Sequence, residues 1–272
     1  WLKRRNRLRP TVCCFSKDTG RMGAHASSCL PGGLNAPSNQ KPSRMTLKYF
    51  PIPGRAEPIR LALTLGQLAF YDQRIPMSDW ERKHKKATPY GQLPVLVVEQ
   101  TTLAQSGAIL RYVGKLARYA GRPLYPAEPL LAAKVDEIVN AFDDLWLVLA
   151  PTYSIPIQSE REDARRLLFH PGGDGTIVLD LVEKMLPMRD AGYIIPEAGL
   201  TIADLLIFCF LNMLRSGFVE GLAYPNPFSG FPRIMKHKEL IATLPEVKEY
   251  YSKPALSNPA DVPYYQVFLP GK

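Results

Sequence analysis

Two residues in the stretch from Pro89 to Lys115 are of types that suit the binding of a small peptide. Pro94 stands at the start of an apolar run, where it cannot donate to a strand ladder, so it marks a turn and a candidate cis peptide bond. A cis bond would leave the backbone N–H and C=O of Leu93 free for an extended peptide. Ser106 precedes an apolar-periodic segment, where its hydroxyl, the nearby N–H groups and the helix dipole favour a carboxylate. The stretch predicts either a site for a peptide carboxylate or an ordinary hairpin followed by a capped helix.

A frame of short strands and helices must position these residues. Tyr49 lies near the end of an upstream strand beside a Pro/Gly turn, so its hydroxyl can face a cleft; the alternative is a tyrosine packed at a sheet edge. The expected elements are a strand at 46–50, a turn at 51–54, a helix at 55–65 with Gly66 at the C′ position, a strand at 70–74, a charged loop at 79–88, strands at 95–98 and 102–104, and a helix from Ser106. This order, β-α-β, linker, β-β-α, is the thioredoxin-like pattern.

The rest of the chain is expected to be helical. Proline and glycine interrupt all periodicity near residues 118–129, which predicts a linker there. Thr201 and Asp204 form a capping-box variant ahead of the most apolar helix, which runs to about Leu214. An apolar row on one long helix is either core packing or, in part, a contact with a partner subunit. The row consists of Leu131, Val135, Ile138, Phe142, Leu145 and Leu149.

The net charge of +9 is concentrated at one end of the chain. Residues 1–44 hold nine Lys or Arg and one acid, a charge of +8, which leaves +1 for residues 45–272. A nearly neutral body argues against nucleic-acid binding by the folded part. Residues 1–44 lack apolar periodicity, so we expect disorder. They are either an organelle transit peptide or upstream sequence ahead of Met45, and both interpretations stay open.

Cysteine and histidine offer no disulfide or metal chemistry to the expected fold. Only Cys209 lies outside the leader, no Cys-x-x-Cys occurs, and the four histidines are scattered without metal-ligand spacing. The sequence predicts a reducing compartment and no metal. The apolar run from Leu205 to Leu211 is too short to span a membrane.

Three motifs together resemble the glutathione-binding half of a cytosolic glutathione S-transferase of the tyrosine-using classes (alpha, mu, pi and sigma). They read TLKYFPIPGRAEPIRL, GQLPVL and LAQSGAILRY. The likeness runs from Met45 to the C-terminus, strongly to about Trp146. It implies a thioredoxin-like α/β domain at 45–121 followed by an all-helical domain at 122–272.

The resemblance assigns roles to individual residues. Tyr49 would donate a hydrogen bond to the glutathione sulfur, since a free thiol of pKa about 8.5 is only a few per cent ionised at pH 7. One charge-assisted hydrogen bond of roughly 1.5–3 kcal/mol supplies most of the 2.7 kcal/mol or so that lowering this pKa by two units requires. The implied glutathione-binding residues are Tyr49, Arg55, Trp80, Lys86, Gln92, Leu93, Pro94, Gln105, Ser106 and Asp144.

Within this set, Trp80 and Lys86 would hold the glycine end, although Lys83, His84 and Lys85 compete for the role of Lys86. Asp144 would reach the γ-glutamyl amine of glutathione in the other subunit of a homodimer. Its neighbour Asp143 is the alternative for that role. Tyr90 resembles the aromatic key that inserts into the partner subunit in some classes.

The second substrate leaves fewer marks. Phe50, Ile52, Leu149 and Tyr153 are expected either to wall an apolar pocket beside Tyr49 or to belong to the core. The implied function is conjugation of the glutathione thiolate to small apolar electrophiles, with glutathione as co-substrate, in cytoplasmic detoxification. The alternatives are a non-catalytic glutathione-binding carrier and a sigma-type glutathione-dependent isomerase or peroxidase.

Overall fold

The computed structural model describes residues 44–188, 192–222, 228, 230–252, 265 and 267–271. The expectation for the leader therefore lies outside the described residues, apart from Arg44, and so does the whole segment from Pro254 to Tyr264. One contact unit spans Asn39–Lys272. None of the helices described is both long enough and apolar enough to cross a bilayer.

The N-terminal half is built on a four-stranded mixed sheet in the order β2-β1-β3-β4. Its strands are β1 (Met45–Tyr49), β2 (Tyr71–Arg74), β3 (Val95–Val98) and β4 (Thr101–Ala104). β1 pairs parallel with β2 and antiparallel with β3, and β3 pairs antiparallel with β4. The parallel pair requires a crossover, which α1 (Glu57–Leu65) supplies.

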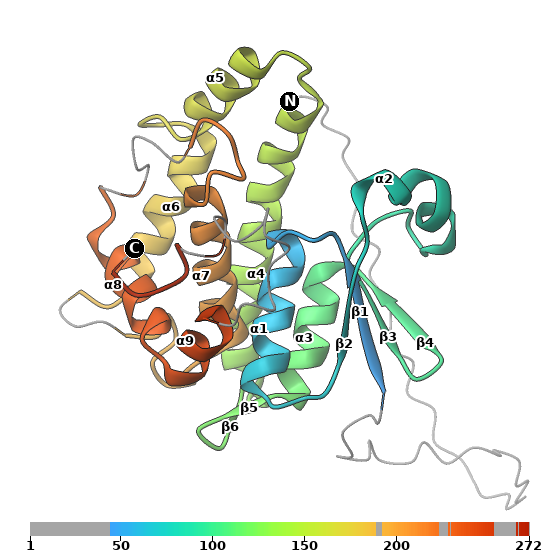
Figure 1. The fold of residues 1–272 in the computed structure, drawn as a ribbon. Coiled ribbons are helices and arrows are strands. Elements are labelled where there is room, and N and C mark those ends of the chain that lie inside the picture. Colours follow the sequence, from blue (N-terminus) through green and yellow to red (C-terminus); the bar gives the residue numbers. More distant parts are fainter. Residues whose placement is uncertain are drawn as a thin grey trace, which may run out of the picture. The chain divides into compact units, whose positions relative to one another are not determined.

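Side-chain alternation along β1 decides which face is covered. Met45, Leu47 and Tyr49 are buried, while Thr46 and Lys48 are half-exposed. Helices α1 and α3 (Ser106–Leu116) pack against each other and lie between the sheet and the helical half (Figure 1). The thioredoxin-like prediction is confirmed.

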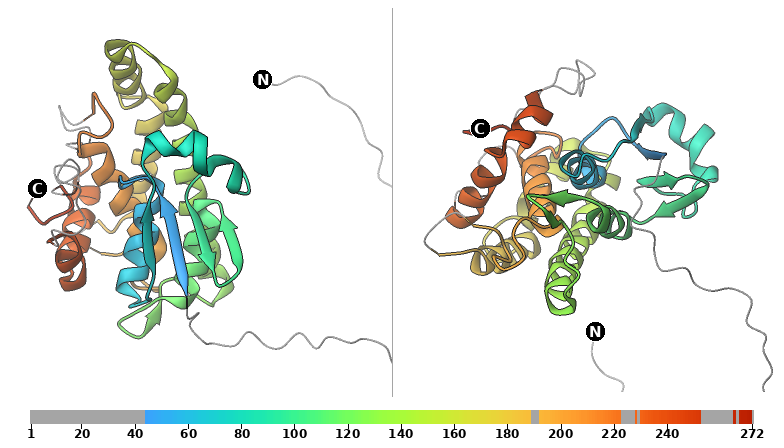
Figure 2. Two further views of the ribbon diagram at one scale, coloured as in Figure 1. Left: turned by 45° about the vertical axis from the view of Figure 1, so that its right-hand side comes forward. Right: turned by 90° about the horizontal axis from the view of Figure 1, so that it is seen from below.

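The helical half surrounds one buried helix, α7 (Ile202–Arg215), which packs against α1, α4 and α8 (Figure 2). The capping box is confirmed, because the buried carboxylate of Asp204 accepts hydrogen bonds from the Thr201 backbone N–H and hydroxyl, both at 2.8 Å. The other helices are α4 (Pro129–Leu149), α5 (Gln158–Leu168), α6 (Asp174–Met185), α8 (Pro232–Ala242) and α9 (Pro245–Ser252).

Two local expectations were wrong, and the expected linker contains an element that the sequence did not predict. Residues 77–87 form consecutive helical turns, at Met77–Asp79, Trp80–His84 and Lys85–Ala87, where a loop was expected. The linker contains a small hairpin of β5 (Arg118–Tyr119) and β6 (Arg122–Pro123). Gly66 is the C-cap residue of α1 with a right-handed φ of −75°, and a Cβ there would lie 2.5 Å from the Cβ of Ala117. Close packing, and not a left-handed turn, favours glycine at that position.

The apolar row of α4 is buried within the chain itself. Val135, Ile138, Phe142, Leu145 and Leu149 belong to the core, and Leu131 packs against it. The helix contacts α6 and α7 along this face. The row is therefore core packing, and its length is no argument for a partner subunit.

Candidate active site

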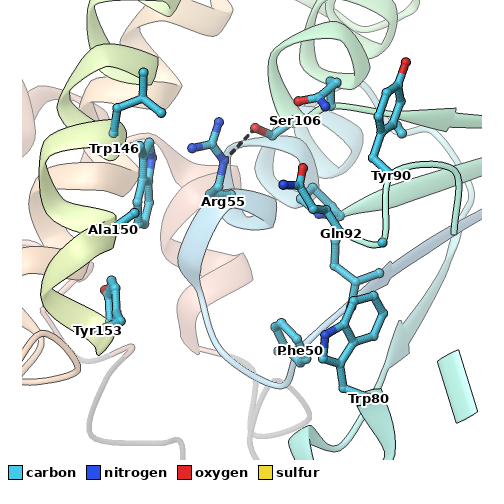
Figure 3. Close-up of a pocket in the computed structure, with 15 residues that line it drawn as sticks. Phe50, Arg55, Trp80, Tyr90, Gln92, Ser106, Trp146, Ala150 and Tyr153 are labelled. Atoms are coloured by element: carbon cyan, nitrogen blue, oxygen red, sulfur yellow. Dashed lines mark hydrogen bonds between the residues drawn. The ribbon is translucent and has the colours of Figure 1, made fainter. Parts of the chain in front are cut away.

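A cavity of about 640 Å³ opens between the sheet half and the end of α4 (Figure 3). Its size is in the range of small-molecule sites. One side is made by the turn after β1, the helical turns at 77–87 and the segment 90–106, and the opposite side by the end of α4 and the turn that follows it. The lining residues are Phe50, Arg55, Trp80, Tyr90, Gly91, Gln92, Leu93, Pro94, Ala104, Gln105, Ser106, Trp146, Leu147, Ala150 and Tyr153.

The edge that runs from Gln92 to Ser106 offers groups for a peptide main chain and a carboxylate. The Leu93–Pro94 peptide bond is cis, and both residues line the cavity beside Gln92. Gln105 has a φ of +69° and stands at the N-cap of α3, a left-handed conformation that is costly for a residue with a side chain. Ser106 is the first residue of α3, so free N–H groups and the positive end of the helix dipole meet at the cavity.

Arg55 joins the two halves at the cavity. Its Nε donates to the Ser106 hydroxyl at 3.0 Å, as Figure 3 shows, and its guanidinium is ion-paired with Asp143 of α4. The same guanidinium lies 5.3 Å from the ring centroid of Trp146. Asp143 therefore holds Arg55 within this chain, whereas the role expected of Asp144 concerns a second subunit.

Tyr49 lies behind the cavity wall. Its side chain is 6% exposed, and its hydroxyl accepts a hydrogen bond from the Arg55 backbone N–H at 3.1 Å. It is not one of the lining residues, whereas Phe50 and Arg55 are. Burial raises the pKa of Tyr49, although this bond and the Arg60 and Arg55 charges oppose the shift. The phenol therefore stays protonated at neutral pH and keeps an O–H that can donate.

Trp80 and Lys86 were expected to act together, but only Trp80 lies on the cavity. Trp80 lines the cavity and packs edge-on against Phe50, with ring centroids 5.7 Å apart. Lys86 is exposed and does not line the cavity. Of its neighbours, Lys83 is ion-paired with Asp79, and Lys85 with Glu81.

Aromatic side chains line both sides of the cavity. Phe50 and Tyr153 line the cavity as expected of a second-substrate pocket, and Tyr153 faces it from the 3₁₀ turn Ala150–Ser154 (Figure 3). Burial raises the pKa of Tyr153 to about 12. Leu149 is fully buried in the core, and Ile52 packs against the core without lining the cavity. Of the two alternatives that the sequence left open, Leu149 and Ile52 therefore follow the second, core packing.

Two residues expected to meet a partner subunit are on the surface. Tyr90 is 65% exposed at the rim of the cavity. Asp144 is exposed on α4, next to the Asp143 that pairs with Arg55. Their roles toward a second subunit stay predictions.

Sequence reasoning missed one face of α4. Asp143, Trp146 and Leu147 of α4 and Ala150 of the turn that follows it stand at three-, one- and three-residue steps, so they share one face beside the cavity, where Trp146 also packs edge-on against the buried Phe210. An acid, an aromatic residue and two apolar or small residues at this spacing could have indicated, from the sequence, a helix face that borders a site. Within the described residues no cluster of side chains could hold a metal ion, and the one described cysteine, Cys209, is buried.

Comparison with protein families matches both halves of the chain. Residues 45–115 match the family model described as "Glutathione S-transferase, N-terminal domain", and residues 175–254 match "Glutathione S-transferase, C-terminal domain".

Individual relatives cover most of the chain. Glutathione S-transferase 1 of Ascaris suum is 32% identical over 210 residues, which are 76% of this chain and 95% of that protein. The hematopoietic prostaglandin D synthase of Rattus norvegicus is 36% identical over 124 residues, 46% of this chain and 56% of that protein. The crystal structure of Na-GST-3 from Necator americanus, described as monomeric, superposes with a TM-score of 0.61 at 27% identity and covers 76% of this chain and 95% of that one.

Proposed function

The chain belongs to the glutathione S-transferase family, and from this premise we propose that its cavity holds glutathione along the edge from Gln92 to Ser106 and activates the thiol against an apolar electrophile. Enzymes of this family use glutathione as co-substrate. Membership of the family therefore supports the conjugation of glutathione to electrophiles as the general reaction. The observation that carries the proposal is that one edge of the cavity combines Leu93, whose backbone N–H and C=O bond to none of the described residues, with the start of α3.

In this proposal, each end of glutathione meets different groups. The cysteinyl backbone pairs with Leu93, held between Gln92 and Pro94. The γ-glutamyl carboxylate lies at Gln105 and Ser106, where free N–H groups and the helix dipole favour an anion. Trp80 packs against the glycine end, and Lys86 reaches the glycine carboxylate only if its exposed side chain turns toward the cavity.

Thiol activation is proposed for Tyr49, with Arg55 in support. The Tyr49 hydroxyl keeps its proton, and its oxygen is held by the Arg55 N–H, so it is oriented to donate to a sulfur. A hydrogen bond to the thiolate favours the charged form and lowers the pKa of the thiol. The electrophile then lies against Phe50, Trp146 and Tyr153.

Turnover of a chloronitrobenzene with glutathione tests this function directly. We expect saturation by both substrates and loss of glutathione binding in Ser106→Ala, measured by calorimetry. A wild-type protein that binds no glutathione would refute the proposal.

The likeness to rat hematopoietic prostaglandin D synthase favours one second candidate, glutathione-dependent isomerisation of a lipid peroxide. It would use the same residues for glutathione. A prostaglandin endoperoxide, supplied in place of the chloronitrobenzene, separates the two activities.

We further propose a homodimer in which Asp144 of one subunit meets the γ-glutamyl amine bound by the other. The exposed Tyr90 and the 72% exposed Leu147 at the cavity rim support a covered surface there. The relative Na-GST-3 is described as monomeric, so sedimentation is the deciding measurement.

The remaining assignments are proposals as well. They are a domain boundary between residues 121 and 122, a role in detoxification and a cytoplasmic location. The buried, unpaired Cys209 suits a reducing compartment. An organelle remains the alternative if residues 1–44 are a transit peptide.

A further inference from the structure

A buried arginine lies directly beneath the tyrosine that walls the electrophile side of the cavity. Arg165 of α5 is 1% exposed, and its guanidinium carbon lies 4.7 Å from the ring centroid of Tyr153. Tyr153 itself is 43% exposed and lines the cavity. The ring therefore has a cation on its protein side and the cavity on the other.

The same guanidinium holds the turn that carries Tyr153. Arg165 Nε donates to the Thr152 hydroxyl at 3.0 Å, and its Nη1 donates to the backbone oxygen and a carboxylate oxygen of Glu220 at 3.3 and 3.2 Å. Arg161 pairs with the same Glu220 carboxylate at 2.6 Å and donates to the backbone oxygen of Ile155 at 2.8 Å. The turn is thus fixed on both sides of Tyr153.

Burial of an arginine side chain costs free energy unless its N–H groups donate hydrogen bonds and its charge is paired with an anion. Glu220 and Thr152 offset that cost here, and the guanidinium also lies over the Tyr153 ring. A short 3₁₀ turn after a long helix has little regular structure of its own to fix a side chain. The guanidinium over the ring therefore favours one orientation of Tyr153.

We infer that Arg165 is a positioning residue that fixes Tyr153 as a wall for the aryl group of the second substrate and so sets the affinity for that substrate. The inference rests on the proposed function for the identity of the reaction, but the binding of an aryl group is measurable without it. Arg165 touches neither glutathione nor the reacting atoms in this account. It acts through Tyr153 alone.

The test measures saturable quenching of tryptophan fluorescence by nitrobenzene, which has no leaving group and needs no glutathione. Trp80 and Trp146 both line the cavity and report its occupancy. Arg165→Met removes the cation and its stack while Glu220 keeps Arg161 as its partner. Without the guanidinium, the Tyr153 ring should occupy its place at the cavity wall for only a fraction of the time, and the affinity for nitrobenzene falls in proportion to that fraction. We expect the dissociation constant to rise about tenfold.

Three further variants make the result specific. Arg166→Met is the matched control, since Arg166 is the next residue on α5 and pairs at the surface with Glu162 and Asp163. Its nitrobenzene affinity should not change. In Tyr153→Ala, replacement of Arg165 should have no further effect, because its only route to the substrate is gone. Arg165→Lys keeps the charge but loses the planar stack, and we expect a loss of about threefold.

The outcomes are distinct. Unchanged nitrobenzene affinity in Arg165→Met, an equal loss in the Tyr153→Ala background, or a wild type without saturable quenching would overturn the inference. If Arg165→Met does not fold, Arg165→Lys decides by the same readout. Glutathione affinity should be the same in all these variants. A wild type that binds nitrobenzene through Tyr153 but shows no glutathione-dependent turnover would refute only the proposed function.

Discussion

Replacement of Tyr49 by phenylalanine removes one oxygen from the proposed thiol site and leaves its frame in place. The ring is buried in the core between β1 and the Gly54 turn, and phenylalanine keeps that packing. The Arg55 N–H loses its acceptor, which costs about 1 kcal/mol of stability. We therefore expect a folded protein with nearly unchanged glutathione affinity.

The effect on chemistry is larger. A hydrogen bond from a phenol to a thiolate contributes roughly 1.5–3 kcal/mol, which is about one to two pKa units of the bound thiol. Below the pKa the thiolate fraction falls by the same factor, so conjugation at neutral pH should slow about 10²-fold at the upper end. Burial keeps the Tyr49 pKa above its ordinary value, so the pH–rate profile between pH 6 and 9 should report the thiol alone.

Thiolate absorbance of bound glutathione, titrated in both proteins, is the assay. The expected result is a thiol pKa that rises toward its free value in the variant. An unchanged thiol pKa would refute the reasoning. Because Tyr49 is not among the lining residues, that result would transfer thiol activation to groups that are, with Arg55 and Ser106 first.

The other predictions concern the turn, the two acids and the fold. Gly54→Ala places a Cβ 2.5 Å from the Tyr49 hydroxyl, at a residue with φ of +45°, and should slow conjugation at least as much as Tyr49→Phe, measured by turnover. Asp143→Ala frees Arg55 and should weaken glutathione binding at any protein concentration, whereas Asp144→Ala should raise the dissociation constant about tenfold only where sedimentation shows a dimer. Thr201→Ala removes a buried cap and should cost about 1–2 kcal/mol in denaturant unfolding, with turnover unchanged in the folded protein.

Periodicity predicted the regular elements because each one buries a face. The row on α4, whose members are spaced 4-3-4-3-4 along the chain, translates directly into buried side chains. Thr201 and Asp204 located the start of α7 for the same local reason, since a cap depends on residues three apart. The short turns at 77–87 carry mixed charge with no apolar face, so no period revealed them.

The candidate site was only partly predictable. Gln92, Leu93, Pro94 and Ser106 lie on the cavity because short-range motifs fix turns and helix starts. The sequence left Leu149 open between pocket and core, because an apolar residue at a helix end gives the same pattern in both, and the structure places it in the core. Which of two adjacent acids meets Arg55 depends on the packing of α4 against the sheet half, and no local pattern contains that information.

A buried arginine lies against each of the two tyrosines to which the proposals give a role. Arg60, within the apolar face of α1, donates to the backbone oxygens of Phe50 at 3.2 Å and Ile52 at 2.8 Å and pairs with Glu57 at 3.0 Å. Its guanidinium lies 5.7 Å from the ring centroid of Tyr49, much as Arg165 lies beneath Tyr153 at the other end. A lysine has neither the fork nor the plane to make these contacts together. Both tyrosines thus contact a buried arginine that hydrophobic periodicity does not reveal, and in the function and inference proposed above these two arginines hold the tyrosine rings in place.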